Sequence, residues 1–214
     1  MDKRGVRLIL VRHGVTPWNE ADRFQGRVDI GLSPEGEEQA LLLAKRLASE
    51  ELHAIYTSDL KRAWETAARI ALGRDIPIIP EPRFRELDFG AWEGLTYSEV
   101  QARHPEALKR WEEDPWSEAP HGGESLRQLT ERVGGAMKAI VQKHPGQMVL
   151  VVAHGGSFQV LLCLALNLHP KARWQFLLYP ASVSELSLDE RGAVLSLLND
   201  TSHLGSLDIR SGRG

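Results

Sequence analysis

The chain has 214 residues, of which 42% are hydrophobic and 26% are charged, and its formal net charge is −3. This length suits one large domain, and the composition excludes disordered, collagen-like and coiled-coil proteins. A broad surface for nucleic acid or an anionic membrane requires an excess of Lys and Arg, so we expect no nucleic-acid and no membrane partner.

Short apolar runs along the chain predict buried strands. They cover residues 8–11, 54–56, 76–79 and 148–153. These runs are rich in Val and Ile and apolar on both faces, which is typical of strands in a parallel sheet with helices on both sides.

Helical patterns with recognisable starts lie between these runs. Ser33 and Pro34 give an N-cap and a first-turn proline ahead of apolar residues at helical spacing. Thr96 and Ser125 each open a capping box, and the second begins a long amphipathic helix. The alternation of strands and helices predicts an α/β fold, a three-layer α/β/α sandwich with a mostly parallel central sheet.

Residues 102–123 lack a strand-like run and hold Trp111 and Trp116 among prolines and acids. We therefore predict a single domain over residues 1–203, with a small helical cap insertion around residues 95–123 and a loose tail over 204–214. The single cysteine, Cys163, fits a reducing compartment. No apolar run is long enough for a signal-peptide core or a membrane span, so we expect a cytoplasmic protein.

Two predicted strands end in residues that suit anion chemistry. Arg12 and His13 follow the first strand, and His154 and Gly155 follow the last and open a helix. Ligands bind beyond the carboxyl ends of strands in open α/β sheets, and a helix N-terminus favours anions. Two histidines also suit a metal, but the neighbouring arginine would repel a cation. Phosphate is the favoured ligand, provided that the two strands are neighbours.

Further candidates follow the second and third strands. Arg62 falls in the first turn of a helix, where its planar guanidinium suits phosphate oxygens. Three acids, Glu86, Asp88 and Glu93, stand among aromatic residues, where a carboxyl can act as a general acid. The residues alone leave open which of the three does so.

Together these segments form four blocks of sequence that resemble those of the histidine phosphatase superfamily, also called phosphoglycerate-mutase-like. In chain order they read Leu-Val-Arg-His-Gly, Ser-Asp-Leu-Lys-Arg-Ala, Arg-Glu-Leu-Asp-Phe-Gly and Val-Val-Ala-His-Gly-Gly. They occur in the order typical of that family and span residues 8 to about 168. Each block alone would be a weak signal, whereas four in order are a strong one.

The resemblance implies a role for each matching position. His13 is the nucleophile that becomes transiently phosphorylated, Arg12, Arg62 and His154 surround the phosphoryl group, and Glu86 donates a proton to the leaving oxygen. No metal and no cofactor is implied. The residues expected to bind substrate are Asn19, Thr16, Gly155, Gln25 and Gly26.

The family contains both phosphatases and cofactor-dependent phosphoglycerate mutases. In the mutases an arginine after the acidic residue holds the substrate carboxylate, but here Leu87 follows Glu86, and Asp88 would repel a carboxylate nearby. Hydrolysis is therefore favoured over the mutase reaction. A phosphate-binding regulatory protein with little turnover is a further alternative, which the acid Glu86 disfavours because a binder does not need it.

The substrate expected from the resemblance is a small phosphate ester. The Gly-Gly-Glu-Ser run and the segment before it are similar to small bacterial phosphatases. Candidate substrates are α-ribazole 5′-phosphate, sugar phosphates and phosphoglycerates, and a homodimer is the assembly to test. Trp111 and Trp116 either line an apolar substrate pocket or pack the cap onto the sheet.

Overall fold

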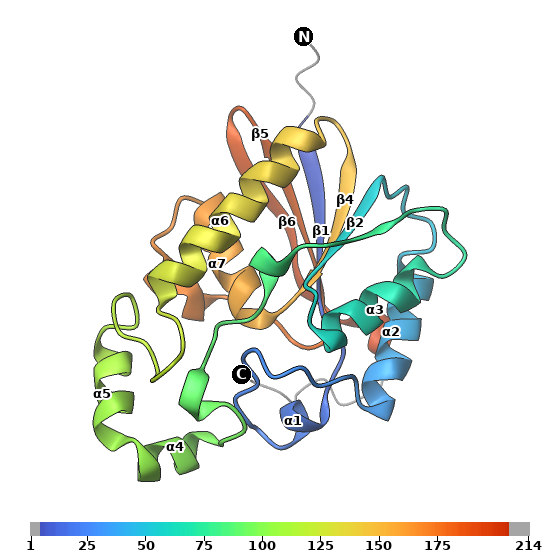
Figure 1. The fold of residues 1–214 in the computed structure, drawn as a ribbon. Coiled ribbons are helices and arrows are strands. Elements are labelled where there is room, and N and C mark those ends of the chain that lie inside the picture. Colours follow the sequence, from blue (N-terminus) through green and yellow to red (C-terminus); the bar gives the residue numbers. More distant parts are fainter. Residues whose placement is uncertain (1–4, 206–214) are drawn as a thin grey trace.

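The computed structural model describes residues 5–205, and within them one six-stranded sheet forms the centre of the molecule (Figure 1). The strand order is β3-β2-β4-β1-β5-β6. The first four strands along the chain pair in parallel, whereas β5 pairs antiparallel with both β1 and β6. The strands are β1 (Val6–Arg12), β2 (Ala54–Thr57), β3 (Ile78–Pro80), β4 (Met148–Ala153), β5 (Val183–Asp189) and β6 (Gly192–Asp200).

All four predicted strands are present, and the β5–β6 hairpin was not predicted. The hairpin extends one side of the sheet, and its register shifts near Val183 and Glu185. Its sequence alternates apolar and polar residues rather than forming one apolar run, as expected of strands with a partly exposed face.

The helices begin where the sequence places their caps. Ser33, Thr96 and Ser125 each accept a hydrogen bond from a first-turn backbone N–H, and the last two form complete capping boxes. The α-helices are α1 (Pro17–Glu20), α2 (Pro34–Arg46), α3 (Lys61–Ala71), α4 (Tyr97–Arg103), α5 (Pro105–Glu113), α6 (Leu126–Lys143) and α7 (Gly155–Ala165). Short 3-10 turns are η1 (Pro82–Phe84), η2 (Gly90–Trp92), η3 (Pro170–Gln175) and η4 (Ser202–Leu204).

The sheet has a hydrophobic core on each face. Leu8 and Leu10 of β1 pack in one core with residues of α6 and α7, and Ile9 and Val11 pack in the other with residues of α2 and α3. Each fully buried side chain of this kind stabilises the fold by about 1.5–3 kcal/mol. The three-layer α/β/α architecture is therefore confirmed.

The α4 and α5 helices lie beyond the end of the sheet at which β1 finishes (Figure 1). Trp111 of α5 is buried and packs edge-on against Trp92, with 5.5 Å between ring centroids. Trp116 is partly buried against the same core and lies 5.1 Å from the ring of His169. The α4–α5 segment therefore covers the ends of the strands that carry the candidate residues.

The predicted tail over 204–214 falls largely outside the described residues. Leu204 is described, and it is buried in the core on the α2 and α3 side. Among residues 5–205, no helix combines the length and the apolarity that crossing a membrane requires.

Candidate active site

Strand pairing brings the two candidate histidines together. β1 and β4 are parallel neighbours, with Arg12 opposite Ala153, so the residues that follow each strand meet at one edge. The backbone N–H of His13 donates to the carbonyl of Ala153 at 3.0 Å, and the centroids of the His13 and His154 rings are 5.1 Å apart. The condition set by the sequence, that the strands be neighbours, is met.

The hydrogen bonds of His13 fix its tautomer. Nδ1 lies 2.7 Å from the carbonyl oxygen of Gly14, which only accepts, so Nδ1 carries the proton. Nε2 then holds a lone pair and accepts from Nε of Arg62 at 3.3 Å. Burial, followed by the positive charges of Arg62 and Arg12, keeps the pKa of His13 well below 6.5. The ring is therefore neutral and nucleophilic at neutral pH.

Arg62 is completely buried in the first turn of α3. Besides the bond to His13, its Nη1 and Nη2 atoms donate to the carbonyls of Val28 at 2.9 Å and Gly26 at 2.8 Å. Burial lowers the pKa of Arg62 to about 10, so the side chain stays charged at neutral pH. A guanidinium has five N–H groups, and these bonds leave two for a ligand.

Arg12 ends β1 and lies against the N-terminus of α7. Its Nη1 atom donates to the carbonyl of Leu178 at 2.5 Å, while Nε has no hydrogen-bond partner among the described residues. A Cβ at Gly155 would lie 3.5 Å from Cζ of Arg12, an ordinary contact distance, which shows how near the helix terminus lies to the guanidinium. Burial lowers the pKa of Arg12 to about 10, and nearby Glu86 opposes that change.

Geometry separates the three candidate acids. Glu86 lies in the cavity wall, where Oε2 accepts from the backbone N–H of Gly156 at 3.0 Å. Asp88 instead forms an ion pair with Arg27 at 3.3 Å, and Glu93 accepts from the backbone N–H of Arg27 at 2.6 Å. Only Glu86 of the three contributes to the cavity wall.

His154 lies behind the cavity rather than in its wall. It is completely buried, and its Nε2 is 2.8 Å from Oγ of Ser58. In the part of the chain that the structure describes, its Nδ1 has no hydrogen-bond partner. Burial and then the charge of Arg62 keep the pKa of His154 well below 6.5. Its neutral ring adds no positive charge to the two arginines.

The loop after β1 is held by side-chain hydrogen bonds. Thr16 caps α1, and its hydroxyl lies 3.0 Å from Oδ1 of Asn19 and 2.9 Å from Oε1 of Gln25. Asn19 and Gln25 reach the cavity wall, whereas Thr16 does not. Gly26 has φ +52°, and a Cβ there would clash with Oε1 of Glu93, so glycine is required at this position. Thr16 thus supports Asn19 and Gln25 from outside the cavity wall, and its contact with substrate stays a prediction.

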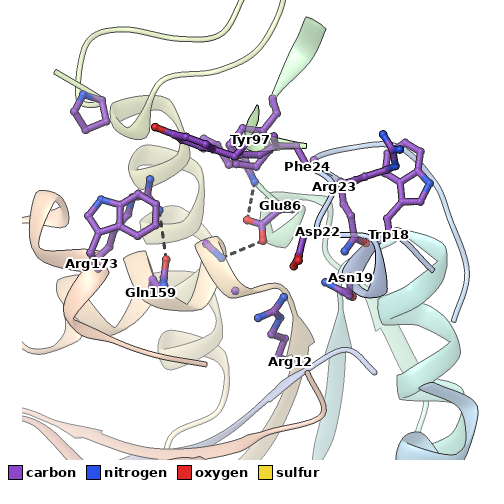
Figure 2. A pocket seen from close by; sticks show the side chains of 18 of the residues that line it. Arg12, Trp18, Asn19, Asp22, Arg23, Phe24, Glu86, Tyr97, Gln159 and Arg173 are labelled. Atoms are coloured by element: carbon purple, nitrogen blue, oxygen red, sulfur yellow. Dashed lines mark hydrogen bonds between the residues drawn. The ribbon is translucent and has the colours of Figure 1, made fainter. Parts of the chain in front are cut away.

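These residues surround a cavity of about 860 Å³ (Figure 2). Most predicted site residues contribute to its wall, the exceptions being His154 and Thr16. The predicted residues in the wall are Arg12, His13, Asn19, Gln25, Gly26, Arg62, Glu86 and Gly155. Much of the remaining wall is aromatic, and its aromatic residues are Trp18 of α1, Phe24, Phe89, Tyr97 of α4, Trp111 of α5 and Trp174 of η3.

Comparisons with known proteins agree with this geometry. The family model described as the histidine phosphatase superfamily (branch 1) matches residues 8–201. The chain belongs to the histidine phosphatase superfamily. Phosphoserine phosphatase 1 of Hydrogenobacter thermophilus is 39% identical over 206 residues, which cover 96% of this chain and 98% of that protein. A metal-independent phosphoserine phosphatase of Arabidopsis thaliana is 38% identical, over 94% of this chain and 84% of the relative.

Solved structures extend the match. YhfR of Bacillus stearothermophilus superposes with a TM-score of 0.86 at 36% identity and covers 93% of this chain and 99% of its own. A structure titled a putative α-ribazole-5′-P phosphatase from Escherichia coli also gives 0.86, at 27% identity, covering 91% of this chain and 96% of that one. This member of the superfamily is a phosphatase of small molecules, as the sequence predicted.

The phosphatase cavity contains residues that sequence reasoning missed. Trp111 was considered as a lining residue and does line the cavity, whereas Trp116 does not. Asp88, expected to repel a carboxylate near Glu86, is turned toward Arg27 and lies outside the wall. The missed lining residues include Asp22, Arg23, Tyr97, Gln159, Arg173 and Trp174. None of them follows a predicted strand, so the rule that located Arg12 and His13 could not find them.

Proposed function

We propose that this phosphatase hydrolyses small phosphate monoesters through a phosphorylated His13, without a metal. The observation that carries the proposal is the neutral Nε2 of His13, held beside Arg62 at 3.3 Å in the wall of the cavity that also presents Arg12 and Glu86. A neutral imidazole next to two fixed cations suits attack on a dianionic phosphate.

The reaction proceeds in two displacements. In the first, the Nε2 lone pair attacks phosphorus, the ester P–O bond breaks, and Glu86 gives its proton to the leaving oxygen. In the second, Glu86 accepts a proton from a water molecule whose oxygen attacks phosphorus. The P–N bond then breaks, which releases inorganic phosphate and returns His13 to its neutral form.

The arginines stabilise charge on the transferring group. The transition state of phosphoryl transfer spreads negative charge over the equatorial oxygens, so preorganised donors at those oxygens lower the barrier. Arg12 and Arg62 already hold protein carbonyls through part of each guanidinium, which fixes their positions. Loss of one such donor costs about 10²–10³ in kcat. The N-terminus of α7, whose Gly155 and Gly156 lie in the cavity wall, completes the phosphate site.

The substrate proposal stays at the level of small phosphate esters. The names of the relatives support phosphoserine as a candidate beside α-ribazole 5′-phosphate, sugar phosphates and phosphoglycerates. A phosphate-release screen over these compounds ranks them. We also propose a cytoplasmic location, which the free and buried Cys163 supports because such thiols persist in reducing compartments.

The decisive experiment compares wild type with His13→Ala on p-nitrophenyl phosphate. We expect the variant to lose turnover by at least about 10⁴-fold and to form no acid-labile phosphoenzyme, because no other group supplies the first displacement. Cys163→Ala, a buried site away from the cavity wall, should retain both. Wild-type activity should survive a chelator. Retained turnover in His13→Ala would overturn the nucleophile, and loss of activity with chelator would overturn metal independence.

A further inference from the structure

The cavity contains a third buried cation that the phosphoryl-transfer steps do not use. Arg173, on η3, is 3% exposed and belongs to the cavity wall. Figure 2 shows it beside Gln159, apart from Arg12 and Asn19. Burial lowers the pKa of Arg173 to about 10, so the guanidinium is charged at neutral pH.

The hydrogen-bonding capacity of Arg173 is almost unused. Its Nη1 atom lies 3.4 Å from Oε1 of Gln159, and within residues 5–205 neither Nε nor Nη2 has a hydrogen-bond partner. The guanidinium stacks on the ring of Trp174, with Cζ 3.7 Å from the ring centroid. Stacking satisfies the face of the guanidinium and leaves the N–H groups at its edge unpaired. A buried charge without a carboxylate partner is costly, which favours a site whose counter-ion arrives with the ligand.

Helix geometry sets the distance from this cation to the phosphate site. Gly155, at the N-terminus of α7, lies near Arg12, since a Cβ added there would be 3.5 Å from its Cζ, and Gln159, four residues along the same helix, contacts Arg173. Residues four apart lie on one face of a helix and are separated by about 6 Å along its axis. The two cationic sites therefore fit two anionic groups about one helical turn apart.

We propose that Arg173 determines specificity by binding a carboxylate of the substrate, which rests on the proposed phosphatase function. The spacing fits phosphate esters whose carboxylate is separated from the ester oxygen by one or two carbon atoms, as in phosphorylated hydroxy acids and hydroxy amino acids. The nearby acid Glu86 attracts Arg173 but holds none of its N–H groups, so the edge of the guanidinium is free to form a paired contact with a carboxylate.

The experiment uses pairs of esters that differ only by the carboxylate. O-phosphoserine is compared with O-phosphoethanolamine, and 3-phosphoglycerate with glycerol 3-phosphate, as ratios of kcat/KM. We expect wild type to prefer the carboxylated member of at least one pair by about 10- to 100-fold, the range of a charge-assisted hydrogen bond. Arg173→Gln should bring that ratio to within about threefold of one, and Arg173→Lys should give an intermediate value.

Two further variants serve as an alternative to Arg173→Gln and as a control. Gln159→Glu places a carboxylate against the guanidinium and should lower the ratio by about tenfold even if Arg173→Gln does not fold. Lys171→Gln removes a charge from the same turn, where Lys171 pairs with Asp114 at 2.8 Å outside the cavity wall, and should leave the ratio unchanged.

The outcomes separate this proposal from the phosphatase mechanism. A wild-type ratio near one in both pairs, or a ratio unchanged in Arg173→Gln and Gln159→Glu, overturns the role of Arg173 while leaving phosphohistidine chemistry intact. Turnover of glycerol 3-phosphate by His13→Ala overturns the mechanism whatever the ratios are.

Discussion

His13 owes its reactivity to groups that keep a proton from Nε2. Burial and two arginines depress its pKa, and the carbonyl of Gly14 keeps the only ring proton on Nδ1. The same arginines that lower the basicity of the ring attract the phosphate, so one pair of charges both activates the nucleophile and binds the electrophile. This dual effect explains why the site places cations, rather than an acid, beside the histidine.

Gly156 provides a test of how closely Glu86 must be positioned. A Cβ at Gly156 would clash with Oε1 of Glu86 and lie 3.3 Å from its Cδ. Gly156→Ala should therefore displace the carboxyl and lower kcat by about 10- to 100-fold, since small misplacements of a catalytic group are costly. Stability should hold or rise by up to about 1 kcal/mol, because alanine favours a helix over glycine.

Steady-state kinetics and thermal unfolding of the same preparation measure both effects. Gly135→Ala, in the middle of α6 and 3.6 Å from the Arg83 side chain, is the matched control and should gain stability without loss of kcat. Equal kcat in Gly156→Ala and wild type would show that catalysis tolerates displacement of the Glu86 carboxyl.

Local signals explain which elements could be predicted. Strands β1, β2 and β4 each contain a continuous apolar run. Ser33, Thr96 and Ser125 cap helices through contacts within four residues. A short stretch of sequence therefore encodes each of these elements. The β5–β6 hairpin was missed because alternating residues give a weaker signal than a buried run.

The candidate site divides in the same way. Arg12 and His13 were found because they follow a strand. The choice of Glu86 over the other two acids as the proton donor required the family resemblance or the structure. Arg173 depends on stacking against Trp174 and on Gln159 from α7, contacts that no local pattern records. Arg173 lies in the cavity wall because of tertiary contacts, which a local sequence pattern does not show.

Arg132 of α6 fixes the segment that carries Glu86. Its guanidinium donates to the backbone carbonyls of Arg85 at 2.6 Å and Glu86 at 2.8 Å, and it pairs with Glu124. Arg132 is thus a positioning residue that acts through Glu86. Arg132→Met should reduce kcat by about 10-fold or more with a smaller change in KM, because the acid loses its alignment.

Stability and pH profiles distinguish positioning from a general loss of folding. Arg132→Met also removes the guanidinium from the carbonyl of Glu86 and from that of Arg85, which keeps the Ser157 hydroxyl as a donor, so we expect a destabilisation of about 1–3 kcal/mol in denaturant unfolding. Arg127→Met, at an exposed position of the same helix, should change neither quantity. If Arg132→Lys restored kcat fully, the multiple carbonyl contacts of the guanidinium would not be needed.

At the scale of the whole molecule, a net charge of −3 coexists with a concentrated basic site. Arg12, His13, Arg62, Glu86 and Gly155 come from four separate segments that meet at one cavity. Each buried cation there costs solvation energy, so the folded state gains when an anion binds between them.

Inorganic phosphate should therefore raise the Tm of the whole chain. Binding at a concentration of 100 times Kd stabilises the folded state by about 2.7 kcal/mol, which corresponds to about 5–10 °C for a protein of this size. Differential scanning fluorimetry measures the shift, with chloride at equal ionic strength as the control. Arg62→Gln should lose most of it, and an equal shift in that variant would place the stabilising anion elsewhere.

The buried histidines also make stability depend on pH. His13 and His154 have pKa values well below 6.5 when folded, whereas in the unfolded chain each binds a proton near pH 6.5. Near and below that pH the unfolded state holds more protons, so the free energy of unfolding falls as the pH falls, and it levels off about one pH unit above 6.5. Between pH 6.5 and 5.5 the two rings together should lower the free energy of unfolding by about 2 kcal/mol.

Urea unfolding at several pH values measures this slope. The double variant His13→Gln/His154→Gln should reduce it to the smaller part that His203 contributes, since burial also lowers the pKa of His203, while His121→Gln, at an exposed position, should leave it unchanged. An undiminished slope in the double variant would mean that groups other than His13 and His154 take up the protons on unfolding.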